Sequence, residues 1–324
     1  MEINSRNIRK LSLLGPSGAV GTAMEELVKD RDDVYVLTAD LCTFSGLDRF
    51  KAKYPGRIFN MGIAEQNMVA VAAGMAKEGL NPFVTSYATF LCARAADSVR
   101  VNLSYMQLPV KMIGLTSGYA AGFLGATHMC IEDIAFMRCL PNMTVISPAD
   151  CTEIVKAVTA SADIDAPVYI RLTGNMPSSI IYTEDYDFVI GKAVKLKEGS
   201  DICFFACGSM VYKVMKIAEG LEEMGINSAV VNMHTIKPLD KDIIDEMAGK
   251  TKLFITVEEH NVLGGLGSAV AEYISNKKSG PILERIGIED LFIKSGDYEY
   301  QLSESGLSDD QIKERVLKVY KDII

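Results

Sequence analysis

The sequence predicts an α/β protein of two domains, and three observations support this. Short β-rich apolar runs alternate with helical patterns along the chain, which is typical of parallel α/β units. The alternation loosens once, where Pro, Ser and acidic residues cluster between residues 176 and 198. A length of 324 residues also suits two domains, each with its own core. We therefore expect domains at residues 1–175 and 199–324, joined by a linker at 176–198.

Each domain should alternate strands and helices. Strands are expected where apolar runs are short and bounded by turn residues, and helices where apolar residues recur at helical spacing. In the first domain we expect strands at 33–41, 82–88, 109–117, 143–149 and 167–174, and helices at 64–79, 90–105, 131–140 and 151–162. In the second we expect strands at 201–209, 227–235, 252–259 and 281–288, and helices at 211–225, 241–249, 267–277 and, as a closing element, 307–324.

The composition argues against several classes of protein. A net charge of −9 and a pI of about 5.0 disfavour nucleic acid or an anionic membrane as the main partner. No apolar run is long enough to span a bilayer, and the N-terminus lacks the apolar core of a signal peptide. The seven cysteines are scattered and form no C-x-x-C pair, so we expect free thiols in the cytoplasm rather than zinc ligands or disulfides.

Few side chains are candidates for catalysis, because the chain has three histidines, no tryptophan and no metalloprotease, P-loop or nucleophile-elbow signature. Glu65 is the most informative candidate. It falls in the first turn of a helix whose next residues, Met68 to Ala76, are all apolar or small, so it should lie at a buried helix N-terminus. Such a carboxylate either complements the helix dipole or shares a proton with a ligand nitrogen. The residues alone leave both interpretations open.

Five segments resemble, in the same order, the C-terminal subunit of split transketolases, which are relatives of transketolase and 1-deoxyxylulose-phosphate synthase. They are GIAEQNM, TFLCARAADSVR, GATHMCIEDIAFMRCLPNMTVISPAD, NMHTIKPLD and TVEEHNVLGGLGSAVAE, and together they run along nearly the whole chain. The resemblance implies a pyrimidine-binding thiamine-diphosphate fold, with helices on both faces of a parallel sheet, followed by a smaller α/β C-terminal domain. It also implies transfer of a two-carbon ketol unit from a ketose donor to an aldehyde acceptor.

The resemblance assigns three residues to the aminopyrimidine ring of thiamine diphosphate. Glu65 corresponds to the glutamate that hydrogen-bonds the pyrimidine ring nitrogen, which helps the exocyclic nitrogen take a proton from the thiazolium ring. Tyr87 and Phe90 would supply the aromatic surface on which the ring stacks, because aromatic faces pack a flat heterocycle without competing hydrogen bonds. Core packing where a strand enters a helix is the alternative for both residues.

Further residues are assigned by the same resemblance. Asp40 and Leu41 match an Asp-Leu pair near the cofactor at the dimer interface, at a strand end where α/β sheets bind ligands. His128, in GATHMCIED, matches a histidine that contacts substrate. His234 and His260 also match family sequence, but they belong to the second domain, and we interpret both as structural.

The family's magnesium and diphosphate motif, G-D-G followed by Asn, is absent from this sequence. We therefore expect an N-terminal transketolase subunit to hold the diphosphate and the Mg²⁺, with no metal ligand on this chain. The cofactor should lie between the two polypeptides, and an α2β2 heterotetramer is the expected assembly.

Several groups that bind a sugar phosphate in ordinary transketolases are missing here. Gap-free spacing places other residues at five of those positions, namely Ser17, Phe44, Thr116, Phe123-Leu124 and Gly174. Losing so many charged or hydrogen-bonding groups predicts an atypical acceptor, an atypical donor or lost activity. Leu124 implies a less hydroxylated or bulkier substrate, and Arg171 or partner residues would replace the lost charge.

Two other interpretations remain open. One is the β subunit of another thiamine-diphosphate enzyme, of the 2-oxo acid dehydrogenase or 1-deoxyxylulose-phosphate synthase type, although the run IAFMRCLPNMTVISPAD favours the transketolase side over the dehydrogenases. The other is a non-catalytic subunit that only completes the fold of its partner. Glu65 and His128 argue against this second interpretation, because a purely structural chain has no physical need for either.

Overall fold

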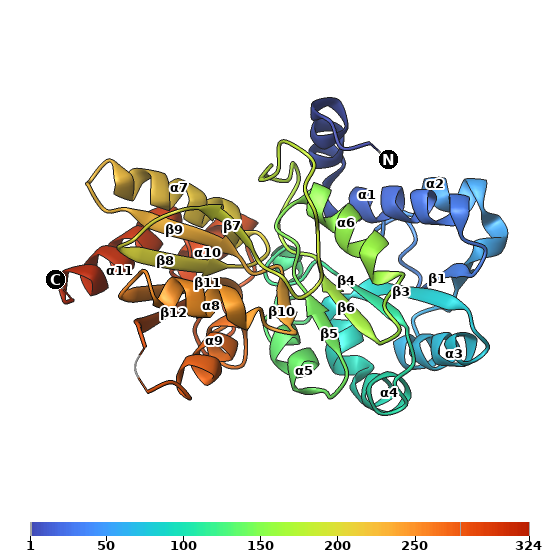
Figure 1. The fold of residues 1–324 in the computed structure, drawn as a ribbon. Helices are drawn as coiled ribbons and strands as arrows, with labels where there is room; N and C mark the ends of the chain where they lie inside the picture. The colour runs from blue at the N-terminus through green and yellow to red at the C-terminus, as the bar shows by residue number, and fades with distance from the viewer. Residues whose placement is uncertain (1, 279, 324) are drawn as a thin grey trace.

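The structure is a computed structural model that describes residues 2–278 and 280–323. It contains two largely parallel sheets that lie side by side, each with helices on both faces (Figure 1). The first sheet has seven strands and the second has five. The predicted α/β class, with a larger and a smaller domain in chain order, is therefore confirmed.

The first sheet has the strand order β10-β5-β6-β4-β3-β1-β2, and its neighbours are parallel except for the antiparallel pair β10–β5. Strands β4 and β6 are buried throughout, as expected for parallel strands that are covered on both faces. The strands are β1 Val34–Thr38, β2 Ile58–Asn60, β3 Asn81–Tyr87, β4 Lys111–Leu115, β5 Thr144–Ile146, β6 Val168–Arg171 and β10 Thr235–Lys237.

The chain returns to the first sheet after it has entered the second. The run 227–235 is not the single strand that was expected, because it forms β9 (Ser228–Asn232) in the second sheet and then β10 in the first. Between them, the Met233 N–H donates to a carbonyl of the second sheet, that of Ala206, at 2.7 Å. The His234 carbonyl accepts from Ser147 N–H, just after β5, also at 2.7 Å. The chain therefore changes sheets within two residues.

Helices α1 and α6 cover one face of the first sheet, and α3, α4 and α5 cover the other (Figure 1). The sequence pattern did not predict α1. This helix is interrupted at Gly15, which has a φ of 71°, and the next residue is Pro16. The predicted helix at 90–105 is instead two π-helical segments, Phe90–Arg94 and Val99–Tyr105, on either side of α4. The helices are α1 Ser5–Asp30, α2 Asp48–Lys53, α3 Glu65–Lys77, α4 Ala96–Ser98, α5 Asp133–Cys139 and α6 Cys151–Ser161, with 3-10 turns at Pro55–Arg57 and Gly122–Leu124.

The second sheet has the order β12-β11-β8-β9-β7, and only β7 is antiparallel to its neighbour. Strand β7 falls inside the segment that was expected as a linker, and α10 was not predicted. The predicted closing helix is present and begins with a capping box between Ser308 and Gln311. The elements are β7 Val194–Lys197, β8 Ile202–Ala206, α7 Met210–Glu222, α8 Lys241–Ala248, β11 Leu253–Asn261, α9 Leu266–Ile274, β12 Ile282–Ile288, α10 Tyr298–Glu304 and α11 Asp309–Lys321.

Within residues 2–278 and 280–323, the structure has no helix with both the length and the apolar character needed to cross a bilayer. All seven cysteines carry free thiols, and five of them are buried.

Candidate active site

The candidate residues gather at the carboxyl ends of parallel strands in the first sheet. Asp40 follows β1, Tyr87 ends β3 and Thr116 follows β4, and β3 lies between β1 and β4 in the sheet. Open α/β sheets bind their ligands at this edge. The topology therefore brings together segments that are far apart in the sequence.

Glu65 is the first residue of α3, and its side chain is buried, with a relative exposure of 1%. Ser86 Oγ donates to Oε1 at 3.1 Å, and Arg94 NH1 donates to Oε2 at 2.8 Å. The Arg94 side chain is 38% exposed, so only one end of this ion pair reaches solvent. The result is a buried carboxylate that is fixed by two donors at a helix N-terminus, as the apolar run after it predicted.

Three rings from different segments lie next to this carboxylate. The Tyr87 and Phe90 centroids are 5.9 Å apart, and the His128 ring meets Phe90 at 5.4 Å and Tyr87 at 5.8 Å, both edge to face. The guanidinium of Arg94, which pairs with Glu65, lies 4.0 Å from the centre of the Phe90 ring. All three rings are half-buried. The structure therefore brings Glu65, Tyr87, Phe90 and His128 together.

Asp40 and Leu41 lie in the loop after β1, which Asn60 ties to the segment before Glu65. The Asp40 N–H donates to Asn60 Oδ1 at 2.9 Å, and Asn60 Nδ2 donates to Asp40 Oδ1, also at 2.9 Å. The same Asn60 Oδ1 accepts from the Gly62 N–H at 3.0 Å. Asp40 has a φ of 60°, a left-handed conformation that Asp adopts more readily than most residues. The Asp-Leu pair is thus held in register with the start of α3.

Four of the five atypical positions line one cavity of about 520 Å³. It lies between the second half of α1, the loop after β1, and the segments that follow β4 and β6. Among the described residues that line it, Arg49 is the one basic side chain, and Glu25 and Asp48 are acidic. Arg49 is already within 3.4 Å of the Glu25 carboxylate. The atypical residues in the lining are Ser17, Phe44, Thr116 and Gly174.

The fifth position, Phe123-Leu124, lies on the 3-10 turn after β4, outside the residues that line the cavity. Both side chains are exposed, Phe123 at 72% and Leu124 at 42%. Two adjacent exposed apolar side chains therefore lie on the same loop as His128.

The expectation that Arg171 replaces a lost phosphate contact is wrong. Its side chain is 1% exposed, and its Nε lies 2.9 Å from Oδ2 of Asp133, which is fully buried. Its NH2 donates to the Glu259 carbonyl of β11 at 2.7 Å, and Tyr169 OH donates to the same Asp133 carboxylate at 2.6 Å. Arg171 is therefore paired with Asp133, as a buried charge has to be. Its bond to the Glu259 carbonyl makes it part of a buried polar network that joins the two domains.

Replacing Arg171 with methionine should destabilise the fold. The variant leaves Asp133 buried without its cation, which costs about 3–5 kcal/mol in typical proteins. Chemical denaturation should report this loss, whereas the matched change at the exposed Arg100 should alter the unfolding free energy by less than about 0.5 kcal/mol. A fully stable Arg171→Met protein that binds only anionic substrates more weakly would contradict this assignment.

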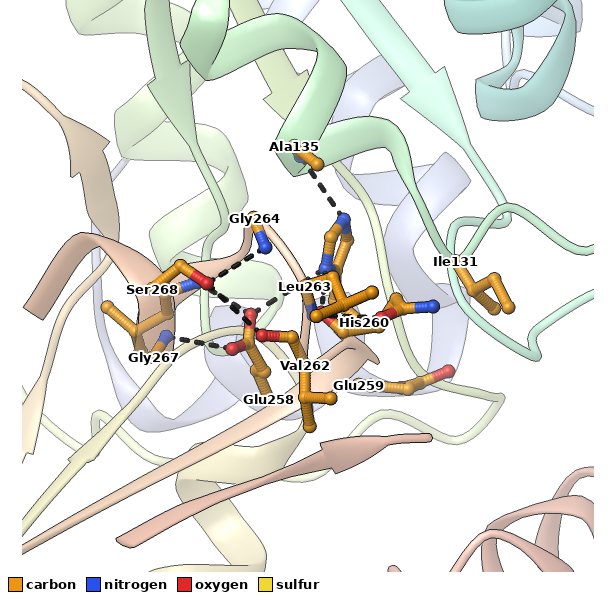
Figure 2. Close-up of polar contacts among 12 residues, drawn as sticks. Ile131, Ala135, Glu258, Glu259, His260, Val262, Leu263, Gly264, Gly267 and Ser268 are labelled. Carbon is orange, nitrogen blue, oxygen red and sulfur yellow. Dashed lines mark hydrogen bonds and ion pairs between the residues drawn. The ribbon is translucent and has the colours of Figure 1, made fainter. Parts of the chain in front are cut away.

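The other two histidines lie away from the ring cluster, at the junction of the domains. His260 Nδ1 is 2.7 Å from the Asn261 carbonyl, and Ala135 N–H donates to its Nε2 at 3.3 Å, so the ring is neutral, with the proton on Nδ1. Burial lowers the pKa of His260 to about 4, and that of His234 likewise to about 4. Figure 2 shows His260 pointing toward Ala135 at the start of α5. Neither imidazole faces the candidate site.

The residues present fit an aminopyrimidine ring. A buried carboxylate can hydrogen-bond a ring nitrogen, and half-buried aromatic faces can pack the ring. Sequence reasoning missed Arg94 and Ser86, which hold Glu65; the spacing of four between Phe90 and Arg94 was the available signal for the first. In the part of the chain that the structure describes, no group of three or more His, Cys, Asp or Glu residues is placed to hold a metal ion.

Comparison with known proteins identifies the family. The transketolase pyrimidine-binding domain matches residues 16–176, and the transketolase C-terminal domain matches residues 191–312. A 6-deoxy-6-sulfo-D-fructose transketolase subunit from Clostridium sp. strain MSTE9 is 39% identical over 90% of this chain and 90% of its own length. A subunit of the apulose-4-phosphate transketolase from Phocaeicola vulgatus is 36% identical over 91% of this chain and 94% of its own length.

A solved structure is also similar. A split-gene transketolase described as an inactive β4 tetramer superposes with a TM-score of 0.87 at 38% identity, covering 94% of this chain and 98% of that one. The sequence and structural matches agree on both domains and on their order. The chain therefore belongs to the transketolase family. It is a transketolase-like transferase subunit that corresponds to the C-terminal subunit of split transketolases.

Proposed function

We propose that this chain is the catalytic C-terminal subunit of a two-subunit enzyme that transfers a two-carbon ketol unit from a ketose donor to an aldehyde acceptor of unusual structure. The observation that carries the proposal is the buried Glu65 carboxylate beside the cluster of Tyr87, Phe90 and His128. A subunit that only completed the fold of its partner would not need a desolvated carboxylate next to half-buried rings.

Each residue of the site then has a role. Thiamine diphosphate, when bound, supplies the electron sink for this transfer. Glu65 hydrogen-bonds the pyrimidine ring nitrogen and shares a proton with it, while Tyr87 and Phe90 pack against the ring. The Nδ1 atom of His128 lies 2.9 Å from Thr127 Oγ1, and we assign its Nε2 to a substrate hydroxyl. Asp40 and its neighbour Leu41 form the edge of the pyrimidine site.

The rest of the cofactor site belongs to a partner. We propose an N-terminal transketolase subunit that holds the diphosphate and its Mg²⁺, and an α2β2 assembly with this chain. Relatives that are named as transketolase subunits, which this chain matches over 90% and 94% of their own length, support the division of the site between two polypeptides. Free cysteines, several of them buried, suit assembly in a reducing compartment such as the cytoplasm.

The cavity lined by Ser17, Phe44 and Thr116 supports an acceptor with a weakly charged end. The arginine in its lining is offset by Glu25 and Asp48, so a phosphate dianion would meet little net positive charge there. Phe44 places an apolar ring at a position that is polar in ordinary transketolases. Its ring packs against that of Tyr87, with 6.2 Å between the centroids. Relatives named for 6-deoxy-6-sulfo-D-fructose and apulose 4-phosphate support a substrate outside the common pentose phosphates.

Restoring charge should shift the specificity toward phosphorylated pentoses. We expect Ser17→Arg combined with Leu124→Asp, in the reconstituted pair, to raise kcat/KM for ribose 5-phosphate about tenfold to a hundredfold, the effect of one strong charge-assisted contact. Gly174 is not a good site for the arginine, because its φ of 87° strains any side chain.

The neutral pair Ser17→Gln with Leu124→Asn is the matched control, and it should leave ribose 5-phosphate a poor acceptor. Initial rates with xylulose 5-phosphate as the donor provide the measurement. A wild-type pair that already uses both pentose phosphates at ordinary transketolase rates would overturn the proposal of an unusual acceptor.

A further inference from the structure

The loop between β4 and α5, residues 116–132, carries the substrate side of the candidate site. It holds Thr116 at the cavity, the turn with Leu124, and His128 in the ring cluster. Glu65, Tyr87 and Phe90 belong to other segments of the first domain. The position of this loop therefore decides how the substrate groups face the pyrimidine groups.

Strand β11 of the second domain holds both ends of the loop. Near its start, the Tyr119 N–H donates to Glu259 Oε1 at 2.7 Å. At its end, the Ile131 carbonyl accepts from the Asn261 N–H, also at 2.7 Å. Figure 2 shows Ile131 and Glu259 in the same region as His260, which bonds the first turn of α5. The loop is thus anchored to the second domain at two points that are twelve residues apart in the sequence.

Glu259 is itself rigidly held. It is fully buried, and its Oε2 accepts from the hydroxyl groups of Ser209 and Tyr298, which come from the start of α7 and from α10. A buried carboxylate with several donors has one favoured position. Gly118, next to Tyr119, has a φ of 66°, and a Cβ there would lie 2.2 Å from Glu259 Oε1. The loop therefore approaches this carboxylate as closely as a glycine backbone permits.

Helix α10 holds the middle of the loop. Gln301, which is fully buried, donates from Nε2 to the Gly122 carbonyl at 3.1 Å and to the Lys294 carbonyl at 3.1 Å. A Cβ at Gly122 would lie only 1.4 Å from Gln301 Oε1. The Tyr119 hydroxyl is also 2.7 Å from Ser305 Oγ, just after the helix. The turn that presents Leu124 is thus fixed by a side chain of the other domain.

We propose that Gln301 and Glu259 of the second domain are positioning residues that hold the 116–132 loop, and with it Leu124 and His128, at the substrate side of the site. The proposal rests on the proposed function. Among the described residues, the ring cluster around Glu65 comes from the first domain, so this loop is a route by which the second domain can influence the reaction. Loss of the contacts from Gln301 or Glu259 should raise the acceptor KM and leave Glu65, Tyr87 and Phe90 in place.

Gln301→Leu is the most direct test, because it keeps the volume of the side chain and removes both donated hydrogen bonds. In the complex with the N-terminal subunit, we expect the acceptor KM to rise about tenfold to a hundredfold, as misplacement of a binding group by about 1 Å can do. The affinity for thiamine diphosphate should stay within about twofold. Hydrogen exchange followed by mass spectrometry should show faster exchange in residues 117–131 than in wild type.

Val316→Ala is the matched control. Val316 lies on α11 in the apolar core that also takes in Tyr119 and Ile131 of the loop, so the variant lowers second-domain stability but leaves the hydrogen bonds that hold the loop in place. It should lower Tm while leaving the acceptor KM and the exchange of residues 117–131 unchanged. If it raises the acceptor KM as much as Gln301→Leu does, the effect is general destabilisation and the proposal is wrong.

Two further variant sets keep the proposal falsifiable if Gln301→Leu fails to fold. Glu259→Gln keeps an oxygen acceptor for the Tyr119 N–H but loses the acceptor of the Ser209 and Tyr298 hydroxyls, so it should have a smaller effect than Glu259→Leu, which should behave like the Gln301 variant. Tyr119→Phe and Ser305→Ala should raise the acceptor KM in the same direction, by less. A folded Gln301→Leu complex with wild-type KM and wild-type exchange overturns the proposal. Faster exchange in a complex that has no transketolase activity would overturn the proposed function alone.

Discussion

Replacing Glu65 with glutamine should abolish most turnover while leaving the protein folded and assembled. The amide has the same shape and can still accept the hydrogen bond from Ser86, but it cannot share a proton with a ring nitrogen. Positioned acid–base groups contribute about 10²–10⁴-fold to rates, so kcat should fall by that factor. Arg94 is left without its anion, but it is 38% exposed and can be hydrated, so the fold should lose little stability.

Two measurements separate this role from a structural one. Exchange of the C2 proton of bound thiamine diphosphate, followed by NMR, should become very slow in the Glu65→Gln complex, while the cofactor still binds within about tenfold. The control is Glu78→Gln at the exposed end of the same helix, which should exchange at the wild-type rate. Near wild-type C2 exchange in the Glu65 variant would show that the carboxylate serves only the helix N-terminus.

The second large effect concerns the cofactor itself. Thiamine diphosphate carries most of its charge on the diphosphate, and in the proposed division of the site this chain contacts the pyrimidine side. Charge-assisted contacts to an anion contribute about 1.5–3 kcal/mol each, so losing even two of them weakens binding by about a hundredfold or more. We therefore expect this chain alone to bind thiamine diphosphate at least about a thousandfold more weakly than the complex, since the Mg²⁺ that the N-terminal subunit would hold is missing as well.

Local patterns predicted the parts of the site that depend on nearby residues. The apolar run after Glu65 predicted a buried helix N-terminus, because helix burial follows from residues within a few turns. The apolar alternation likewise predicted most strands of both sheets. In α1, Gly15 and Pro16 interrupt the pattern, although the second half of the helix packs firmly against α6. The helix is interrupted at these two residues, as local propensity favours, and packing against α6 holds its second half in place.

Long-range pairing decided what the sequence could not predict. Arg171 stands near the carboxyl end of β6, where ligands commonly bind, yet Asp133 neutralises it from 38 residues away. The run 227–235 has the pattern of one strand, but its last residue pairs with β5 of the other sheet. The hold of Gln301 on Gly122 spans 179 residues. Such contacts are set by the topology of two sheets, which periodicity along the chain does not encode.

The measurement that tests the division of the cofactor site most directly is calorimetric titration of thiamine diphosphate with Mg²⁺ into three samples. These are this chain alone, the N-terminal subunit alone, and the two mixed in equal amounts. We expect tight, magnesium-dependent binding only in the mixture, because the proposed cofactor site lies between the two chains. Tight binding to this chain alone would contradict a divided site, as would a mixture that binds no better than the isolated N-terminal subunit.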